Sequence, residues 1–247
     1  MLSIKKEKIE KIKEITNLFL EDNVVSFPIK IYNQDERVLD LVLVNEKDWK
    51  KAIRILTQRG YKKEFNLGEL RENLKKHYSK EGFSIHLHKT ISWNGVKFLD
   101  PKKVWERKVS INGFHYPCPE DEASIIIAHS FFENRFIDPY DFFRYFQIKN
   151  NLNFKQIEKN AKEFNWNKAY YIFKSKISKK EYNLAFKELT NASFSKLLKD
   201  LTKLRLKYIL REIIDYFFVD IIWCHRNKSK YMKKWNGYQE KIRELKC

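Results

Sequence analysis

The sequence predicts an α+β protein in which a mixed sheet with flanking helices comes first and an all-helical part follows. Residues 83–93 alternate apolar and polar side chains with the period of a β-strand, and residues 37–44 form a short, mostly apolar run with leucine at positions 39, 41 and 43. After the Pro-Cys-Pro sequence at 117–119, apolar residues recur with the period of an α-helix almost to the end of the chain. Because proline fits neither a strand ladder nor a helix interior, we expect an α/β domain over 1–116 and a helical domain over 117–247.

The first elements follow from local signals. An amphipathic helix is expected over 3–21, because isoleucines recur on one face of a segment rich in lysine and glutamate. Strands are expected over 24–32 and 37–44, joined as a hairpin through a turn that contains asparagine and aspartate. A helix that Asn45 can cap and Gly60 can end comes next.

The rest of the first half contains further strands. The charged segment 69–80 is interpreted as a short polar helix or loop, and the alternating residues 83–93 as one strand. The segments 95–98 and 108–116 favour more strands or a hairpin, the latter with an Asn-Gly turn. In the second half, helical periodicity predicts helices over 120–136, 138–150, 153–165, 166–177, 179–190 and 193–227.

Composition constrains the function class. The formal net charge is +18, which raises the odds of an anionic partner such as RNA, DNA or a nucleotide. A lysine-rich composition can also reflect a thermophilic or AT-rich source. Three cysteines without a C-x-x-C pair disfavour a cysteine zinc site and fit a reducing cytoplasm. The charged N-terminus is unlike a signal peptide, and the most apolar run is too short for a bilayer, so we expect a soluble cytoplasmic protein without a membrane partner.

One acidic residue lies in an otherwise apolar strand face. In the strand over 37–44, three leucines would share one face, while Asp40 would lie among valines on the other. Burying a lone carboxylate is costly unless a partner or a ligand compensates the charge. We therefore regard Asp40 as the leading functional candidate. The alternative is a structural carboxylate that Arg37 or a backbone N–H holds in place.

Two histidines form a second candidate group. His86 and His88 would lie on one face of the strand over 83–93. Two imidazoles on one face can bind a transition metal, and Asp40 on a neighbouring strand would complete a set of two histidines and one carboxylate. The alternative is a hydrogen-bonded polar row without a metal ion.

Several short motifs occur in a recognisable order along residues 20–150. They are Arg37, Asp40-Leu41-Val42, Arg59-Gly60-Tyr61, Leu87-His88, Ala128-His129 and Asp141. In this order they resemble an uncharacterised nucleotidyltransferase-like family of the DNA polymerase beta-type nucleotidyltransferase superfamily. The resemblance implies a nucleotidyltransferase-like mixed sheet, an NTP as substrate, and Mg²⁺ ions that two or three carboxylates hold around the triphosphate.

The sequence departs from the pattern of that family at the metal-binding positions. The expected Asp-x-Asp pair falls on Val38 and Asp40, so one carboxylate is absent, and the third expected carboxylate falls on His86. The glycine-serine turn that cradles the phosphates is also missing. One aspartate alone makes a poor Mg²⁺ site, because a hard cation needs several oxygen ligands. Asp40 and His86 are the candidate metal ligands, and His88 joins them as a candidate catalytic residue.

Basic residues are the candidate phosphate ligands. Lys30, Arg37 and Lys89 would contact a nucleotide in the cleft, although solvated surface charges are the alternative interpretation. His129 lies on an apolar helix, which favours a hydrogen-bonded core or interface histidine over a catalytic one. Asp141, like Asp138, fits the start of a helix.

The C-terminal segment interleaves lysine and arginine with aromatic residues. Stacking of bases on the aromatic rings, combined with phosphate contacts, would suit single-stranded RNA. The alternative is an exposed basic helix whose aromatic side chains dock on the core. The candidate RNA ligands are Lys230, Lys233, Lys234 and Trp235.

Two functions follow, and they belong to different classes. The first is an enzyme that transfers a nucleotidyl group from an NTP to a hydroxyl of RNA, protein or a small molecule, with a degenerate metal cluster. The second is a catalytically inactive module of the same fold that binds RNA or a nucleotide through its basic surface. A role in protein interaction, such as that of an antitoxin, is a third alternative. The fold alone does not choose between them.

Overall fold

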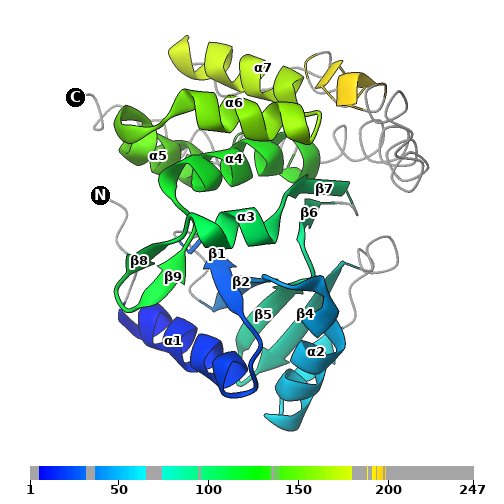
Figure 1. The fold of residues 1–247 in the computed structure, drawn as a ribbon. Coiled ribbons are helices and arrows are strands. Elements are labelled where there is room, and N and C mark those ends of the chain that lie inside the picture. The colour runs from blue at the N-terminus through cyan, green and yellow to red at the C-terminus, as the bar shows by residue number, and fades with distance from the viewer. Residues whose placement is uncertain are drawn as a thin grey trace.

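The computed structural model of the chain has a mixed five-stranded sheet and a group of helices. In the sheet, β2 and β5 are parallel neighbours, whereas the other adjacent pairs are antiparallel. The α+β fold class is therefore confirmed (Figure 1). The strand order is β1 (Ser26–Ile29), β2 (Val38–Leu43), β5 (Phe83–His88), β4 (Lys75–Lys80) and β3 (Lys62–Glu64). The structure describes residues 6–31, 37–64, 74–93, 96–134, 137, 139–179, 188, 191–192, 194–196 and 198.

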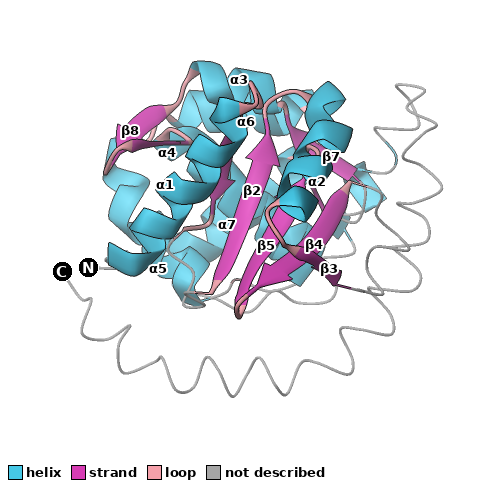
Figure 2. Cartoon of the chain, turned by 90° about the horizontal axis from the view of Figure 1, so that it is seen from below, coloured by secondary structure: helices cyan, strands magenta, loops and turns pink. Residues whose placement is uncertain are grey.

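Two N-terminal helices cover one face of the sheet. The leucines of β2 are buried on this face against helix α1 (Lys6–Glu21) and helix α2 (Trp49–Gln58), as the alternation in the sequence predicts. Figure 2 shows both helices in front of the sheet and the later helices behind it. Asn45 caps the short 3₁₀ turn Glu46–Asp48 that leads into α2, and Gly60 follows the end of α2 with a φ of +82°.

Strand β4 corrects the interpretation of residues 75–80, which the sequence placed in a polar helix or loop over 69–80. Glu81 and Gly82 both have positive φ values, of 52° and 76°, and turn the chain directly from β4 into β5. This is the geometry of a two-residue hairpin, so Gly82 marks a tight turn and not the end of a helix. Lysine has a weak strand propensity, but pairing with β5 on one side and β3 on the other overrides it.

Two short hairpins and a short helix join the sheet to the helical half. The stretch 83–93 is divided into β5 and β6, and β6 pairs with β7. The predicted Asn112-Gly113 turn joins β8 to β9, with φ values of 49° and 84°. Helix α3 was not expected, although Asp100 caps it and Pro101 occupies its first turn. The bounds are β6 (Ile91–Trp93), β7 (Val96–Leu99), α3 (Pro101–Glu106), β8 (Val109–Ile111) and β9 (Phe114–Tyr116).

The helical half begins where the sequence predicts it. Helix α4 is followed directly by a π-helical turn, η3, and then by further helices that pack around it (Figure 1). The helices expected over 179–190 and 193–227 fall largely outside the described residues. The bounds are α4 (Pro119–His129), η3 (Ser130–Asn134), α5 (Pro139–Ile148), η4 (Lys149–Asn151), α6 (Phe154–Glu163) and α7 (Asn167–Ser178).

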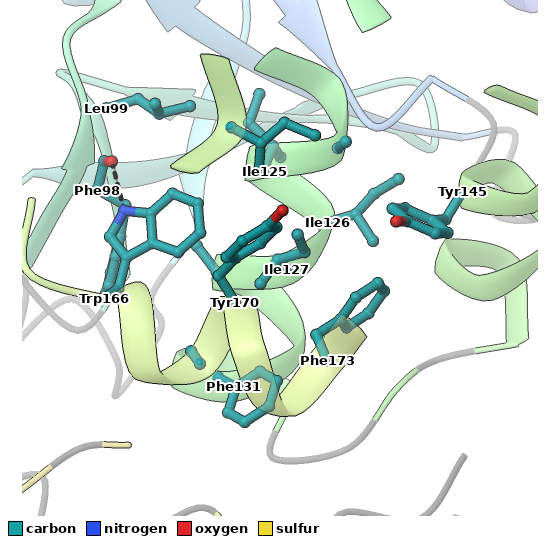
Figure 3. Packing of buried hydrophobic residues seen from close by; sticks show 14 of the residues in the cluster. Phe98, Leu99, Ile125, Ile126, Ile127, Phe131, Tyr145, Trp166, Tyr170 and Phe173 are labelled. Carbon is teal, nitrogen blue, oxygen red and sulfur yellow. Dashed lines mark hydrogen bonds between the residues drawn. The ribbon is translucent and has the colours of Figure 1, made fainter. Parts of the chain in front are cut away.

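Two hydrophobic clusters hold these parts together. The first lies between the sheet and helices α1 and α2. The second centres on the isoleucines of α4 and extends to Phe27, Ile29 and Val42 of the sheet. Figure 3 shows its packing around Trp166, whose indole N–H donates to the Phe98 carbonyl at 3.1 Å. Because this cluster crosses the boundary expected after residue 116, the division into two domains remains a proposal.

No helix in the described part of the chain combines the length and the apolar character that crossing a membrane requires.

Candidate functional site

A polar pocket lies between the open face of the sheet and the helical half. Its cavity volume is about 230 Å³, which is below the 300–1,000 Å³ of ordinary small-molecule sites. The lining comes from both halves of the chain. The lining residues are Ile29, Lys30, Val38, Asp40, Lys75, His86, His88, Trp93, His129, Glu133, Asn134, Tyr140 and Asp141.

The sheet side of the pocket brings together the three residues that the sequence singles out. Asp40 pairs in register with His86 across the parallel strands β2 and β5, and His88 lies two residues further on the same face. The Oδ1 atom of Asp40 lies 3.1 Å from His86 Nδ1 and 3.0 Å from His88 Nε2. The predicted grouping of Asp40 with both imidazoles in one pocket is therefore observed, while their catalytic roles stay a prediction.

The charge state of this group follows from its hydrogen bonds. Burial raises the pKa of Asp40, but the bonds from His86 and His88 outweigh it and hold the pKa well below the usual range. Burial lowers the pKa of His88, so its ring is neutral at neutral pH. A neutral imidazole has only one N–H, and the contact with the carboxylate assigns it to Nε2. Asp40 is therefore an ionised carboxylate that accepts from an uncharged histidine.

The three positions that the resemblance assigns to carboxylates all line this pocket. They are Val38, Asp40 and His86, and only the middle one is acidic. Val38 and Asp40 point the same way because they are two residues apart on one strand. The resemblance therefore implies that valine and histidine stand at two of the three positions where the family has carboxylates.

The helical half supplies the opposite wall of the pocket. His129, at the end of α4, contacts the Asp141 carboxylate at 2.9 Å through Nδ1 and the Glu133 carboxylate at 3.2 Å through Nε2. Lys30 Nζ lies 2.7 Å from His129 Nε2, and Lys75 Nζ lies 3.5 Å from Glu133. His129 is thus an interface histidine, as expected. Asp141 lies in the first turn of α5, but its carboxylate contacts His129.

Opposite charges on this wall stabilise each other. Burial and Lys30 lower the pKa of His129, but Asp141 and Glu133 raise it more, so the pKa stands above its ordinary value. Burial raises the pKa of Glu133, but Lys75, His129 and Lys30 lower it far more. Glu133 is therefore ionised at neutral pH and held among cations.

The sequence-based interpretation missed Lys75 and Glu133. Lys75 belongs to the segment that was interpreted as a helix or loop, so nothing indicated that it faced the sheet pocket. Glu133 lies in the π-helical turn η3 and contacts His129, four residues before it, as residues four apart on a helix commonly do. This spacing from His129 was the signal in the sequence that could have indicated Glu133.

The other predicted ligand residues lie in different places relative to the pocket. Lys30 lines the pocket, but Arg37 and Lys89 are not among its lining residues. Arg37 lies at the start of β2, where its carbonyl accepts from Ser84, and Lys89 follows β5, where its N–H donates to the Leu74 carbonyl. Contacts of Arg37 and Lys89 with a nucleotide therefore stay a prediction. The RNA ligands expected at 230–235 lie outside the described residues.

The side chains on the sheet side of the pocket do not form a binding site for a pair of Mg²⁺ ions. In the described ranges, no group of three or more His, Cys, Asp or Glu side chains is arranged to hold a metal ion. Mg²⁺ prefers oxygen ligands, but the sheet offers one carboxylate, and both of its close neighbours are imidazoles. The metal role expected of Asp40 and His86 stays a prediction, and no chemical step below depends on it.

The mixed sheet followed by helices is the fold expected of a nucleotidyltransferase-like protein. The model of a family of uncharacterised nucleotidyltransferases matches residues 39–174, more than half of the chain. The chain therefore belongs to this family. The matched range includes Asp40, both sheet histidines and the helical wall of the pocket. No curated protein and no solved structure matches the chain.

Proposed function

We propose that the pocket binds the polyphosphate of a nucleoside triphosphate and that two-metal nucleotidyl transfer is weak or absent in this protein. One observation carries the proposal: the positions expected to be acidic, Val38, Asp40 and His86, line one pocket and hold only one carboxylate. Membership of a nucleotidyltransferase family supports a nucleotide as the ligand. The protein would then act as a binding module that keeps the nucleotide pocket of an enzyme.

The charges around the pocket support an anionic ligand. Lys30 and Lys75 enter from the sheet side, and His129, whose pKa is raised by Asp141 and Glu133, enters from the helical side. Ammonium and imidazolium N–H groups form strong charge-assisted hydrogen bonds with phosphate oxygens. The small cavity volume suits the phosphates of a nucleotide better than the whole nucleotide.

Nucleotidyl transfer is the second candidate, because Asp40 is retained, ionised and bonded to a partly exposed histidine. His86 is 26% exposed, and its Nδ1 contacts Asp40. In this function a hydroxyl of RNA, protein or a small molecule gives its proton to His86 while Asp40 stabilises the resulting imidazolium. The hydroxyl oxygen then bonds to the α-phosphorus, and pyrophosphate leaves. Magnesium would be the cofactor expected from the family.

The net charge of +18 keeps RNA as a candidate acceptor or partner. We include it in the test for that reason. If RNA binding is electrostatic, its affinity falls steeply as the salt concentration rises.

One experiment separates these functions. The full chain is incubated with each of the four α-labelled NTPs, with Mg²⁺ or Mn²⁺, and with total cellular RNA, and both bound nucleotide and transferred label are measured. We expect bound nucleotide without label transfer. The enzyme would be established, and the binding module refuted, by robust label transfer that Asp40→Asn abolishes. The control Asp22→Asn, at an exposed site, should leave that transfer intact. Absence of NTP binding under all conditions would refute both.

A further inference from the structure

Three basic side chains from separate elements surround one part of the pocket. Lys30 follows β1, Lys75 begins β4, and His129 ends α4. In this structure Lys75 contacts the Glu133 carboxylate, His129 contacts the Glu133 and Asp141 carboxylates, and Lys30 Nζ lies 2.7 Å from His129 Nε2. Basic groups from three elements that meet at one cavity form a site suited to a multiply charged anion.

Two local departures from regular backbone geometry place these groups. Lys30 has a φ of +53°, a left-handed conformation that is unfavourable for a long side chain and recurs at functional sites. Glu133 and Asn134 belong to the π-helical turn η3 and line the pocket, and π-helical turns also recur at functional sites. The two departures lie on opposite walls of the same cavity.

Glu133 occupies the position of an anion in this pocket. Its carboxylate lies 3.5 Å from Lys75 Nζ and 3.2 Å from His129 Nε2, so it contacts two of the three basic groups at once. It is one-third exposed, which leaves it room to move aside. A phosphate group has the same charge sign and offers more acceptor oxygens for the same donors.

We propose that this pocket binds a nucleoside triphosphate without Mg²⁺. Lys30, Lys75 and His129 neutralise the phosphates, and the triphosphate displaces the side chain of Glu133. This inference rests on the proposed function and specifies its ligand form. A carboxylate cluster needs Mg²⁺ to bridge it to phosphates of the same charge sign. Here two carboxylates of that cluster are replaced, so free triphosphate, which is more negative than its Mg²⁺ complex, is the better ligand.

The test is calorimetric titration of the full chain with ATP and, separately, with inorganic tripolyphosphate, in excess EDTA and in excess Mg²⁺. We expect both probes to bind at least as tightly in EDTA as in Mg²⁺. Lys75→Gln should weaken binding about tenfold or more, because it removes a charge-assisted contact. Glu133→Gln should tighten binding several-fold, because it removes the competing anion but keeps the shape of the side chain.

A matched control guards against a general charge effect. Lys103→Gln removes a surface lysine that pairs with Glu163 at 2.6 Å outside the pocket, and it should leave both affinities unchanged. Thermal unfolding of each variant checks that it folds.

The outcomes separate the inference from the proposed function. Binding that requires Mg²⁺ would overturn the inference and leave the nucleotide-binding function intact. An unchanged affinity in Glu133→Gln would overturn the displacement of that side chain. If neither probe bound with or without Mg²⁺, the proposed function itself would fail.

Discussion

Arg144 of helix α5 neutralises the buried carboxylate of Glu122 in helix α4. Its Nε and one terminal nitrogen each donate to Glu122 at 2.7 Å, and the Tyr116 hydroxyl donates to the same carboxylate at 2.7 Å. The side chain of Glu122 is 3% exposed and that of Arg144 is 24% exposed. Removing one partner of a buried ion pair costs about 3–5 kcal/mol, and the partial exposure of Arg144 favours the lower end, about 3 kcal/mol.

We therefore predict that Arg144→Met lowers the free energy of unfolding by about 3 kcal/mol. For a chain of this size, this corresponds to a fall in Tm of about 6–12 °C. Urea titration followed by circular dichroism measures the free energy, and differential scanning calorimetry measures Tm. Arg54→Met, at an exposed position of α2, is the matched control and should change stability by less than about 0.5 kcal/mol.

The pH dependence gives the same prediction a second test. Burial raises the pKa of Glu122 and Arg144 lowers it, with a net pKa above the ordinary value. The contribution of Glu122 to stability is therefore present below the pKa of the unfolded state and is lost as pH rises through the pKa of the folded state. Without Arg144 the pKa rises further, so the destabilisation should be larger at pH 8 than at pH 5. The double variant Glu122→Gln with Arg144→Met should recover part of the loss, because no uncompensated charge remains. A loss below about 1 kcal/mol, or one independent of pH, would refute the reasoning.

Three further predictions concern the turn, the site and the core. Gly82→Ala should cost about 1–2 kcal/mol in urea titration, because alanine is strained at a φ of +76°; an unchanged midpoint would contradict this. The pKa of Asp40 is lowered by His86 and His88 despite burial, so its stabilising contribution is present above the unfolded pKa and is lost as pH falls through the folded pKa. Asp40→Asn should therefore reduce the fall in the free energy of unfolding as pH is lowered, and a fall as steep as that of the parent protein would contradict this prediction. Trp166→Phe should cost about 1–3 kcal/mol, because it leaves the buried Phe98 carbonyl without its donor, and calorimetry should show a lower Tm.

Sequence periodicity predicts a helix or strand well where the burial of one face of side chains is enough to determine the type of element. The leucines of β2 and the stripe of α1 need only a buried partner, so alternation and helical period identify both elements. Strand β4 fails this test because its lysines resemble those of a surface helix and its strand state depends on pairing with two neighbours. The Glu81-Gly82 turn was the local signal that could have revealed it.

The same reasoning explains which half of the pocket the sequence predicts. His86 and His88 share a face because they are two residues apart on one strand, and the register that pairs Asp40 with His86 brings all three side chains to that face. Lys75 reaches the pocket only because β4 is a strand, and Glu133 reaches it because the helix end that carries His129 packs against the sheet. Both depend on tertiary structure that a single sequence does not show.

The buried position of Asp40 is not in itself evidence of a function. Two imidazole N–H groups satisfy its carboxylate, so the cost of burial is already offset without any ligand. The left-handed backbone of Lys30 lies beside Asp40 on the sheet side, and the π-helical turn η3 forms part of the opposite wall. This turn also contributes Phe131 and Phe132 to the hydrophobic core, so its geometry serves packing as well as the pocket. Both segments bring charged side chains into the same cavity as Asp40, and for this reason the proposed ligand site spans Lys30, Asp40 and Glu133 and is not Asp40 alone.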